Sequence, residues 1–405
     1  MKFLIILKNN PFINSSASSN RWKNLLTSIS NFYDIELLII GGYLNEEEKL
    51  EYSNSGYISE NISYSYQNQI ILKSRLKRIL FKYILFYLSL ILKRKEISKA
   101  LEKKKYDYVL IFPIIEVMYF YSFIILKNKN HKLIIEFNEY PEELYNFSTN
   151  LLQDYFNKKE TKLLKNKIVP NIDIYLVMTL NLLDFIKKKY LNKPTAKFYH
   201  LPMSVDFSRF DNMKFTKWKD TPYIAYAGSS SFIKDGVDIL IKSFDIIAEK
   251  HQEFNLKIAA FWESDGGRMI ELIEKSKFKS RIFYLGSISG NQIPELFKNS
   301  ALLTLPRPNS KQAQGGFPTK LGEYLASGIP VCATTVGEIP DYLTNNESVF
   351  FAEPGSVDSF ANAMDRALSN PELAQKVGMG GRKVAEIHFN KDVQAQKLHK
   401  FLQNL

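Results

Sequence analysis

Short apolar segments recur along the whole chain and alternate with stretches long enough to form a helix. They are apolar almost without interruption, which is typical of strands buried on both faces of a parallel sheet. At 405 residues the chain is also too long for one ordinary hydrophobic core. The pattern therefore predicts the α/β class, with two doubly wound, Rossmann-like parallel sheets. The predicted strands are KFLIIL (2–7), IELLIIG (35–41), YDYVLIF (106–112), KLIIEF (132–137), DIYLVM (173–178), KFYHLP (197–202), YIAYAG (223–228), LKIAAF (256–261), RIFYLG (281–286), ALLTLP (301–306), PVCATT (330–335) and VFFAEP (349–354).

The predicted domain boundary lies in a polar segment of mixed charge, residues 204–222, which ends in a proline. We expect an N-terminal domain over 1–205, a C-terminal domain over 206–384, and a final helix over 385–405 that packs back on the first domain. Open α/β sheets bind ligands beyond the carboxyl ends of their strands, so a central cleft between the two domains is the expected site. Neither half carries GxGxxG after its first strand, so a nicotinamide or flavin cofactor is not indicated.

Most of the net charge of +12 comes from residues 70–105, which hold twelve Lys or Arg and two Glu. This stretch also contains ILFKYILFYLSLIL (79–92), rich in Leu, Ile, Phe and Tyr. A basic, aromatic helix too short to span a bilayer is typical of an interfacial helix on an anionic membrane surface. The alternative is a core helix with a solvated basic end. Nucleic acid is not predicted, because no recognition motif accompanies the charge.

The compartment is predicted from cysteine usage and hydropathy. One cysteine, Cys332, fits a reducing environment. The opening MKFLIIL has only five apolar residues before Lys8, so it is interpreted as a buried strand and not as a signal peptide. No apolar run reaches the roughly 20 residues that span a bilayer. We therefore expect a cytoplasmic protein, with a peripheral position on the inner face of the cell membrane as an option.

The segment GGFPTKLGEYLASGIPV, residues 315–331, carries the most specific local signal. Pro318 suits the first position of a helix and Gly328 the left-handed position that ends one, which predicts a helix from about Pro318 to Ser327. Such a helix start favours phosphate, and Lys320 adds a positive charge there. Glu323 lies on the same face and can accept hydrogen bonds from sugar hydroxyls. The alternative is a capped surface helix with a weak Lys and Glu pair.

Together with other segments, this stretch resembles the retaining GT-B glycosyltransferases of the "group 1" family. GGFPTKLGEYLASGIPVCATTVGEIPDYL resembles the nucleotide-sugar part of the C-terminal domain, and AYAGSSSFIKDGVDILIKSF (225–244) resembles its first strand, loop and helix. LPMSVDFSRF (201–210) is similar to the segment between domains, IFYLGSIS (282–289) to the base-binding edge, and GRKVAEIHF (381–389) to the closing helix. The resemblance covers about residues 197–395 and extends to the first half only by strand order.

The resemblance implies transfer of a hexose from a nucleoside diphosphate sugar, with retention of configuration and without metal or other cofactor. Lys234 and Lys320 would stabilise the leaving diphosphate, and Glu323 would bind the ribose hydroxyls. Because exposed lysines contribute little to stability, replacing either should hardly affect folding. The other residues implied to contact the donor are Gly228, Ser229, Gly286, Ser287, Ile288, Gly315, Gly316, Phe317, Pro318 and Thr319.

The chain departs from the family pattern at four places. Gly315 stands where a second glutamate is frequent, and Ser229 stands where an arginine usually follows the first strand. Asp235 is inserted between Lys234 and the expected glycine. Asn138 and Glu139 follow KLIIEF, where many members have a histidine facing the reaction centre, and they are candidate acceptor or reaction-centre contacts.

Three functions follow from these observations. The first is a transferase that uses a UDP-sugar and a lipid-linked or saccharide acceptor to build a cell-surface polysaccharide or glycolipid, with the N-terminal domain binding the acceptor. The second is a nucleotide-sugar epimerase on the same scaffold, although no acid and base pair can be assigned to it. The third is a non-catalytic nucleotide-sugar-binding protein, which the departures at Gly315 and Ser229 make conceivable.

Overall fold

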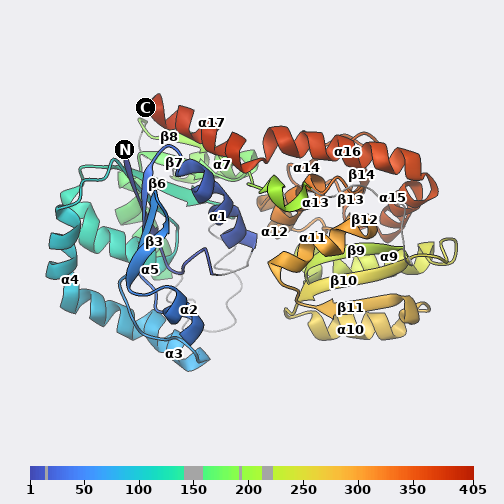
Figure 1. Cartoon of the computed structure of the whole chain (residues 1–405), viewed down its shortest axis with the longest axis horizontal. Helices are drawn as coiled ribbons and strands as arrows, with labels where there is room; N and C mark the ends of the chain where they lie inside the picture. The colour runs from blue at the N-terminus through green and yellow to red at the C-terminus, as the bar shows by residue number, and fades with distance from the viewer. Residues whose placement is uncertain (14–16, 141–157, 191–193, 212–221) are drawn as a thin grey trace. The chain divides into compact units, whose positions relative to one another are not determined.

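The computed structural model describes residues 1–13, 17–140, 158–190, 194–211 and 222–405, which form two compact units (Figure 1). Unit 1 comprises Met1–Asn14, Leu26–Leu201 and Ala395–Leu405, and unit 2 comprises Ser15–Leu25 and Pro202–Gln394. Each unit therefore combines stretches that are distant in the sequence. The domain ranges inferred from the sequence stay predictions.

Among the described residues, unit 1 contains one sheet with the strand order β3-β4-β2-β1-β5-β6-β7-β8. All neighbouring strands are parallel except β3 and β4, which form an antiparallel pair at one edge. The chain leaves β1 toward β2 on one side and returns to β5 on the other, so the strand order reverses between β1 and β5. The strands are β1 (Lys2–Leu7), β2 (Asp34–Ile39), β3 (Ser55–Ser59), β4 (Ile62–Tyr66), β5 (Tyr108–Ile111), β6 (Lys132–Phe137), β7 (Ile174–Val177) and β8 (Lys197–His200).

The helices before residue 202 and the helix α17 follow, of which the part of α1 up to Leu25 and the part of α17 up to Gln394 belong to unit 2 and the rest to unit 1. A longer helical segment, residues 75–102, consists of α3, η1 and α4 in direct succession. The helices are α1 (Ala17–Ile29), α2 (Glu46–Glu51), α3 (Arg75–Leu80), η1 (Phe81–Leu85), α4 (Phe86–Glu102), α5 (Ile115–Phe120), η2 (Tyr121–Ile125), η3 (Leu126–Asn128), η4 (Leu164–Ile168), η5 (Val169–Asn171), α7 (Leu180–Tyr190) and α17 (Lys391–Gln403).

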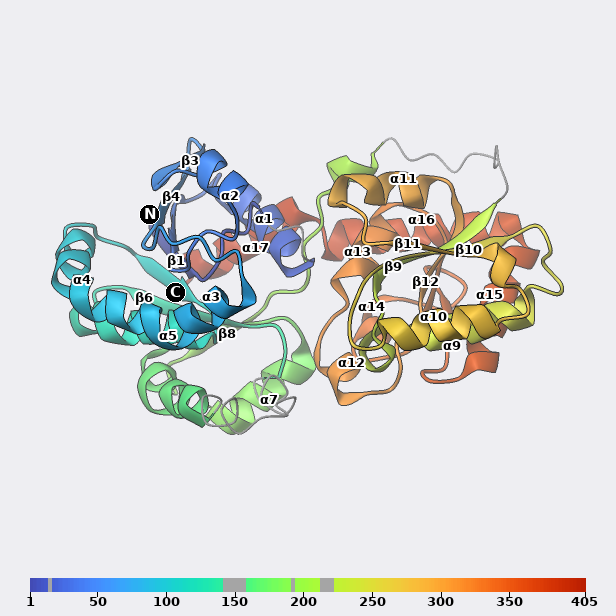
Figure 2. The same ribbon diagram turned by 90° about the horizontal axis from the view of Figure 1, so that it is seen from below.

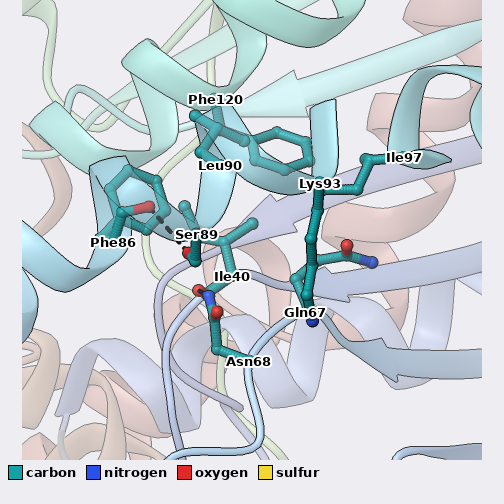
Figure 3. A pocket seen from close by; sticks show the side chains of 9 residues that line it. All are labelled: Ile40, Gln67, Asn68, Phe86, Ser89, Leu90, Lys93, Ile97 and Phe120. Atoms are coloured by element: carbon teal, nitrogen blue, oxygen red, sulfur yellow. Dashed lines mark hydrogen bonds between the residues drawn. The ribbon is translucent and has the colours of Figure 1, made fainter. Parts of the chain in front are cut away.

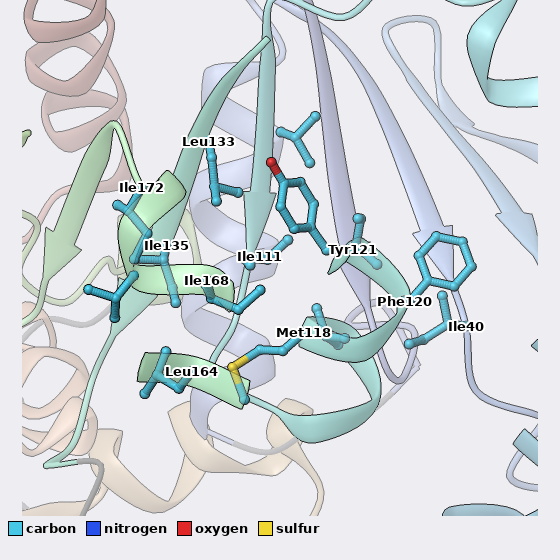
Figure 4. Close-up of a cluster of buried hydrophobic side chains, with 14 of the residues drawn as sticks. Ile40, Ile111, Met118, Phe120, Tyr121, Leu133, Ile135, Leu164, Ile168 and Ile172 are labelled. Atoms are coloured by element: carbon cyan, nitrogen blue, oxygen red, sulfur yellow. The ribbon is translucent and has the colours of Figure 1, made fainter. Parts of the chain in front are cut away.

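The core of unit 1 lies on both faces of the sheet, as continuous apolar strands require. On one face, side chains from β5, β6, α5 and η4 form the cluster in Figure 4, in which Ile111, Ile135 and Met118 lie together. Each fully buried aliphatic side chain of this kind stabilises the fold by about 1.5–3 kcal/mol. On the other face, Phe3 packs against Tyr33 and Tyr108, with ring centroids 5.7 Å and 5.4 Å away.

Unit 2 contains one fully parallel sheet among its described residues, with the order β11-β10-β9-β12-β13-β14. Here the strand order reverses between β9 and β12. The strands are β9 (Tyr223–Ser229), β10 (Asn255–Phe261), β11 (Ile282–Gly286), β12 (Ser300–Leu305), β13 (Val331–Thr334) and β14 (Phe350–Ala352).

Helices cover both faces of the second sheet, with α9 on one face and α11 on the other (Figure 2). The buried core on the α9 side also includes residues of α10 and α15. The helices are η6 (Phe207–Phe210), α8 (Phe232–Asp235), α9 (Val237–Ile247), α10 (Gly266–Lys275), η7 (Lys279–Arg281), η8 (Gly290–Gln292), α11 (Ile293–Lys298), α12 (Lys311–Gly315), α13 (Thr319–Ala326), α14 (Ile339–Tyr342), α15 (Val357–Ser369) and α16 (Pro371–His388).

The prediction of two doubly wound parallel sheets is confirmed, and each of the twelve predicted segments contains a strand. The hairpin of β3 and β4 was not predicted. Its strands, SGYIS and ISYSY, alternate small polar residues with Tyr and Ile, and every second residue of β4 is buried. Alternation of polar and apolar residues is typical of an edge strand with one face exposed to solvent. The prediction was based on continuous apolar runs, which are typical of strands buried on both faces.

The basic stretch 70–105 is helical from Arg75 to Glu102, which includes the apolar run 79–92. No helix in the described ranges combines the length and the apolar character needed to cross a membrane.

Candidate functional site in unit 2

The predicted donor residues of unit 2 gather at the carboxyl ends of β9 and β11 and at the start of α13. The strand order of this sheet reverses between β9 and β12, which is where open α/β sheets bind ligands. Helix α13 begins after Pro318, which is its N-cap, and Gly328 follows it in the left-handed conformation with φ 72°. The predicted helix and its glycine stop are therefore confirmed, whereas Pro318 precedes the first helical position, which Thr319 occupies.

Gly228, near the end of β9, leaves space for the side chain of Lys320. A Cβ at this position would lie 2.3 Å from Lys320 Nζ and 2.4 Å from the Tyr226 hydroxyl oxygen. Any larger residue would therefore displace the lysine. The short helix α8 follows, and the Ser231 side chain caps it by accepting a hydrogen bond from the Lys234 N–H at 3.2 Å.

Lys320 forms an ion pair with Asp235, the last residue of α8. The Nζ and Oδ2 atoms lie 2.7 Å apart, and the two side chains are 17% and 6% exposed. Lys320 also donates a long hydrogen bond, 3.5 Å, to the Tyr226 hydroxyl. The carboxylate of Asp235 accepts two further hydrogen bonds, from Ser229 Oγ at 2.7 Å and from the Ser229 N–H at 3.2 Å. Asp235 thus connects the end of β9 with the first turn of α13.

The charges of this cluster influence one another strongly. Burial would raise the pKa of Asp235, but the nearby Lys320 and Arg307 charges outweigh burial and hold that pKa well below its usual range. Burial lowers the pKa of Lys320, and the Asp235 charge opposes that shift. Burial and the Asp235 charge together raise the pKa of Tyr226 well above its ordinary value. Asp235 is therefore a carboxylate and Tyr226 a neutral hydroxyl near pH 7.

Two expectations from the sequence are corrected here. Lys320 is not an exposed lysine whose removal would leave folding untouched, because its ammonium neutralises a buried carboxylate. The helix α13 also shows no weak pair between Lys320 and Glu323, since each has another partner. The sequence contained an indication of this pair, because Asp235 is inserted before Gly236 and its carboxylate lies beside Lys320.

Lys234 and Glu263 lie in the electrostatic field of the same cluster. Lys234 is half-buried on α8, and its charge adds to the factors that lower the pKa of Lys320. Burial raises the pKa of Glu263, while Lys234 counteracts the shift. The Glu263 N–H donates to Ser230 Oγ at 2.7 Å, which fixes the backbone after β10. Glu263 and Arg307 were missed because neither belongs to a recognisable local motif.

The loop before α13 brings backbone toward the cluster. Gly315 ends the short helix α12, and Gly316 has an extended backbone with φ −122°. The buried Arg307 guanidinium donates to the Gly316 carbonyl oxygen at 3.3 Å. The Phe317 ring is 6% exposed and packs against Phe389 with a centroid distance of 5.2 Å. Phe317 therefore anchors this loop through its ring, Pro318 is buried beside it, and Thr319 is the first residue of α13.

Arg209 connects the predicted ribose and base regions. Its Nη1 forms an ion pair with Glu323 Oε1, and its Nη2 donates to the Gly290 carbonyl oxygen at 2.8 Å. Gly290 closes the loop that begins after Gly286, the last residue of β11, and that contains Ser287 and Ile288. Ser287 is exposed, and Gly286 and Ile288 are half-buried. Arg209, in the segment LPMSVDFSRF, was not predicted as a site residue. The proximity of Glu323 to this loop is established by the shared arginine.

Asn138 and Glu139 lie in unit 1, directly after β6, and both are half-buried. The structure describes them within their own unit, so their part in the site stays a prediction. Residues 212–221 of the predicted boundary segment lie outside the described residues.

The comparisons with known proteins agree with this description. Residues 208–384 match the family model described as Glycosyl transferases group 1. The chain is 25% identical over 215 residues to the capsular polysaccharide biosynthesis glycosyltransferase CapM of Staphylococcus aureus, which covers 50% of this chain and 53% of that protein. Sucrose-phosphate synthase of Thermosynechococcus elongatus aligns with a TM-score of 0.74 and 14% identity, over 100% of this chain and 99% of its own. Anabaena HepE in complex with UDP aligns with a TM-score of 0.70 and 12% identity, over 100% of both chains.

The paired doubly wound sheets define this protein as one of the GT-B fold. Within that fold, residues 208–384 are similar to the family described as Glycosyl transferases group 1. The matches extend over 37% to 53% of the lengths of the curated relatives.

Proposed function

We propose that this protein is a retaining hexosyltransferase that moves a sugar from a UDP-sugar to a lipid-linked or saccharide acceptor, in the synthesis of a cell-surface polysaccharide or glycolipid. The family match and the names of similar proteins support this class. HepE was solved with UDP and with UDP-glucose, CapM is named for capsular polysaccharide biosynthesis, and the similar WaaB is a lipopolysaccharide outer core galactosyltransferase.

The observation that carries the proposal is the position of Lys320, held by Asp235 in the first turn of α13 at the switch point of the sheet. A diphosphate leaving group carries negative charge as its bond to the sugar breaks. A fixed ammonium, the helix start and the nearby Lys234 would stabilise that charge without reorganising during the reaction. Arg307 adds a third positive charge, so the three cations outnumber the carboxylates of Asp235 and Glu263.

In the proposed step, the bond between the anomeric carbon and the diphosphate oxygen breaks and a bond to the acceptor oxygen forms on the same face of the sugar. The acceptor hydroxyl proton passes to the leaving phosphate. Glu323 binds the ribose hydroxyls, and Arg209 fixes the Glu323 carboxylate next to the loop of Gly286, Ser287 and Ile288, which contacts the base. Neither a metal ion nor another cofactor takes part.

Incubation with a panel of labelled nucleotide sugars, with and without lipid-linked acceptors, tests the proposal. Release of nucleotide that depends on the acceptor, with an unchanged anomeric configuration in the product, is the expected result. An isomerised donor would identify an epimerase instead. Binding without turnover over the whole panel would identify a non-catalytic nucleotide-sugar-binding protein.

If only a GDP-sugar served as donor, the proposed transfer reaction would still hold, but the proposal that the donor base is uracil would be wrong. Calorimetry with UDP and GDP separates these outcomes without any acceptor. The predicted cytoplasmic location, with a peripheral position on the inner face of the cell membrane as the option, is checked by cell fractionation.

A further inference from the structure

The helical segment 75–102 of unit 1 presents two different apolar faces. Its inner face contributes Phe81, Phe86, Leu90 and Ile97 to the core, all of them less than one-tenth exposed. Figure 3 shows part of this face, where Phe86, Leu90 and Ile97 lie around a small pocket together with Phe120. The pocket has a volume of about 10 Å³, room for about one water molecule. The inner face is therefore already filled by the protein itself.

The π-helical turn η1 keeps this inner face continuous. Phe81 and Phe86 are five residues apart, which in an α-helix would turn them about 140° away from each other. In η1 the Phe86 N–H donates to the Phe81 carbonyl oxygen, five residues back, so both side chains point to the core. On a regular α-helix, residues four apart shift steadily around the helix axis, because one turn contains 3.6 residues. The π-helical turn contains more residues per turn and reduces this shift, so residues four apart stay on the outer face.

The outer face carries a second apolar row, here called the apolar stripe. Its members follow one another at intervals of four residues up to Leu88, after which Ile91 and Leu92 follow Leu88 at three and four residues, and all are 40% to 83% exposed. They are Leu76, Leu80, Ile84, Leu88, Ile91 and Leu92. Large aliphatic side chains exposed singly are ordinary on a protein surface, but a continuous row of six marks an interaction surface.

The sequence that contains the apolar stripe is strongly basic. Residues 70–105 hold twelve Lys or Arg and two Glu, which accounts for ten of the twelve net positive charges of the chain. Beyond Leu92 the row continues at the same spacing with Lys95, Lys99 and Lys103, all exposed. Apolar side chains that end in a line of lysines are typical of a helix lying in the interface of an anionic bilayer.

We infer that the apolar stripe and its lysines form a docking surface for an anionic lipid membrane, with the leucines and isoleucines inserted among the acyl chains and the lysines at the headgroups. A protein partner is less consistent with this surface, because protein interfaces are depleted in Lys at their centres. The inference goes beyond the proposed transfer reaction, since no proposed donor or acceptor residue belongs to the stripe.

Vesicle flotation tests the inference with the full chain. Vesicles containing phosphatidylglycerol should carry the protein, and pure phosphatidylcholine vesicles should carry much less. Replacing Lys95, Lys99 and Lys103 by Ser should lower partitioning roughly 100-fold, about fivefold for each charge removed. The matched control replaces Lys275, Lys277 and Lys279 of unit 2, also exposed, and should leave partitioning unchanged.

The apolar contribution is tested by the double variant Leu88→Asn and Ile91→Asn, whose parent side chains are 51% and 55% exposed. Partitioning should fall at least about tenfold. The control, Ile246→Asn with Ile387→Asn, removes side chains that are 48% and 59% exposed in unit 2 and should have no effect. Equal flotation of the two double variants, or no flotation of the parent protein, would overturn the inference. The inference would also be overturned if another protein bound to the apolar stripe while vesicles did not.

Selective labelling gives a second readout. The native Cys332 is fully buried and burial raises the pKa of its thiol, so it does not compete for a thiol reagent. A polarity-sensitive dye attached to Leu92→Cys should shift to the blue on anionic vesicles, whereas the same dye on Ile246→Cys should not. Because both labelled proteins retain the proposed donor site, nucleotide binding measured in parallel distinguishes failure of membrane docking from failure of the proposed reaction.

Discussion

Lys320→Met removes one charge of the buried pair while keeping most of the side-chain volume. In the structure the charged atoms lie 2.7 Å apart and the side chains are 17% and 6% exposed. Loss of one partner from a buried pair costs about 3–5 kcal/mol, because the other charge stays buried without it. Ser229 continues to donate two hydrogen bonds to Asp235. We therefore expect the lower end of the range, about 3 kcal/mol.

Differential scanning calorimetry of the ligand-free protein measures this effect. For a unit of this size, 1 kcal/mol corresponds to roughly 2–4 °C, so Lys320→Met should lower the Tm of unit 2 by roughly 6–12 °C. Asp235→Asn should be destabilised as well. The double variant should lose less than the sum of the two single variants, by about 1–3 kcal/mol, because neither charge then remains alone.

The control is Lys242→Met, which breaks an exposed pair between Lys242 and Asp238 with side chains 50% and 20% exposed. Pairs of this kind contribute at most about 0.5 kcal/mol, so its Tm should change by no more than about 2 °C. If Lys320→Met melted like Lys242→Met and the double variant showed simple additivity, the argument that Asp235 depends on Lys320 would be refuted.

Four further results are expected. Lys234→Ala should lower kcat roughly 10²–10³-fold through lost stabilisation of the leaving diphosphate, measured by acceptor-dependent nucleotide release. Glu323→Ala should mainly raise the donor KM, because ribose contacts exist in both ground and transition states; a pure kcat effect in the same assay would contradict this. Chelation with EDTA should leave turnover unchanged. Burial lowers the pKa of His131 from 6.5 to about 4, so folding favours the neutral ring. Urea titrations should show unit 1 losing up to about 3 kcal/mol as the pH falls from 6.5 toward 4, and His131→Gln should remove that dependence.

The main sheet could be predicted because its strands are buried on both faces and therefore consist of uninterrupted apolar runs. KLIIEF, predicted over 132–137, is β6 at those bounds. The hairpin of β3 and β4 was not predicted, because alternate residues of each strand face solvent. Serine, which occupies several of these positions, is also frequent in loops, so the sequence did not distinguish a strand from a loop. Burial by partners distant in the sequence decided its structure, and a local pattern does not contain that information.

For the candidate site, the secondary-structure elements were predicted from the sequence, whereas the ion pairs and hydrogen bonds of the site residues were not. Pro318 and Gly328 marked the bounds of α13, since their backbone preferences are local. The pairing of Lys320 with Asp235 joins residues 85 positions apart, and it depends on how β9 and α13 pack. Arg209, whose two contacts join Glu323 to Gly290, was missed for the same reason.

Unit 1 is formed by stretches of the sequence that lie before and after most of unit 2, so the ribosome completes unit 1 after unit 2. The first strand of unit 1 is made before unit 2, yet the Tyr108 hydroxyl donates to the carbonyl oxygen of Leu402 at 3.0 Å, and Tyr33 forms a hydrogen bond with His399 at 3.0 Å. These last residues leave the ribosome only after all of unit 2 has been made. The part of the first sheet that contacts α17 therefore stays uncovered while unit 2 emerges, so the nascent protein exposes apolar surface there until α17 is released.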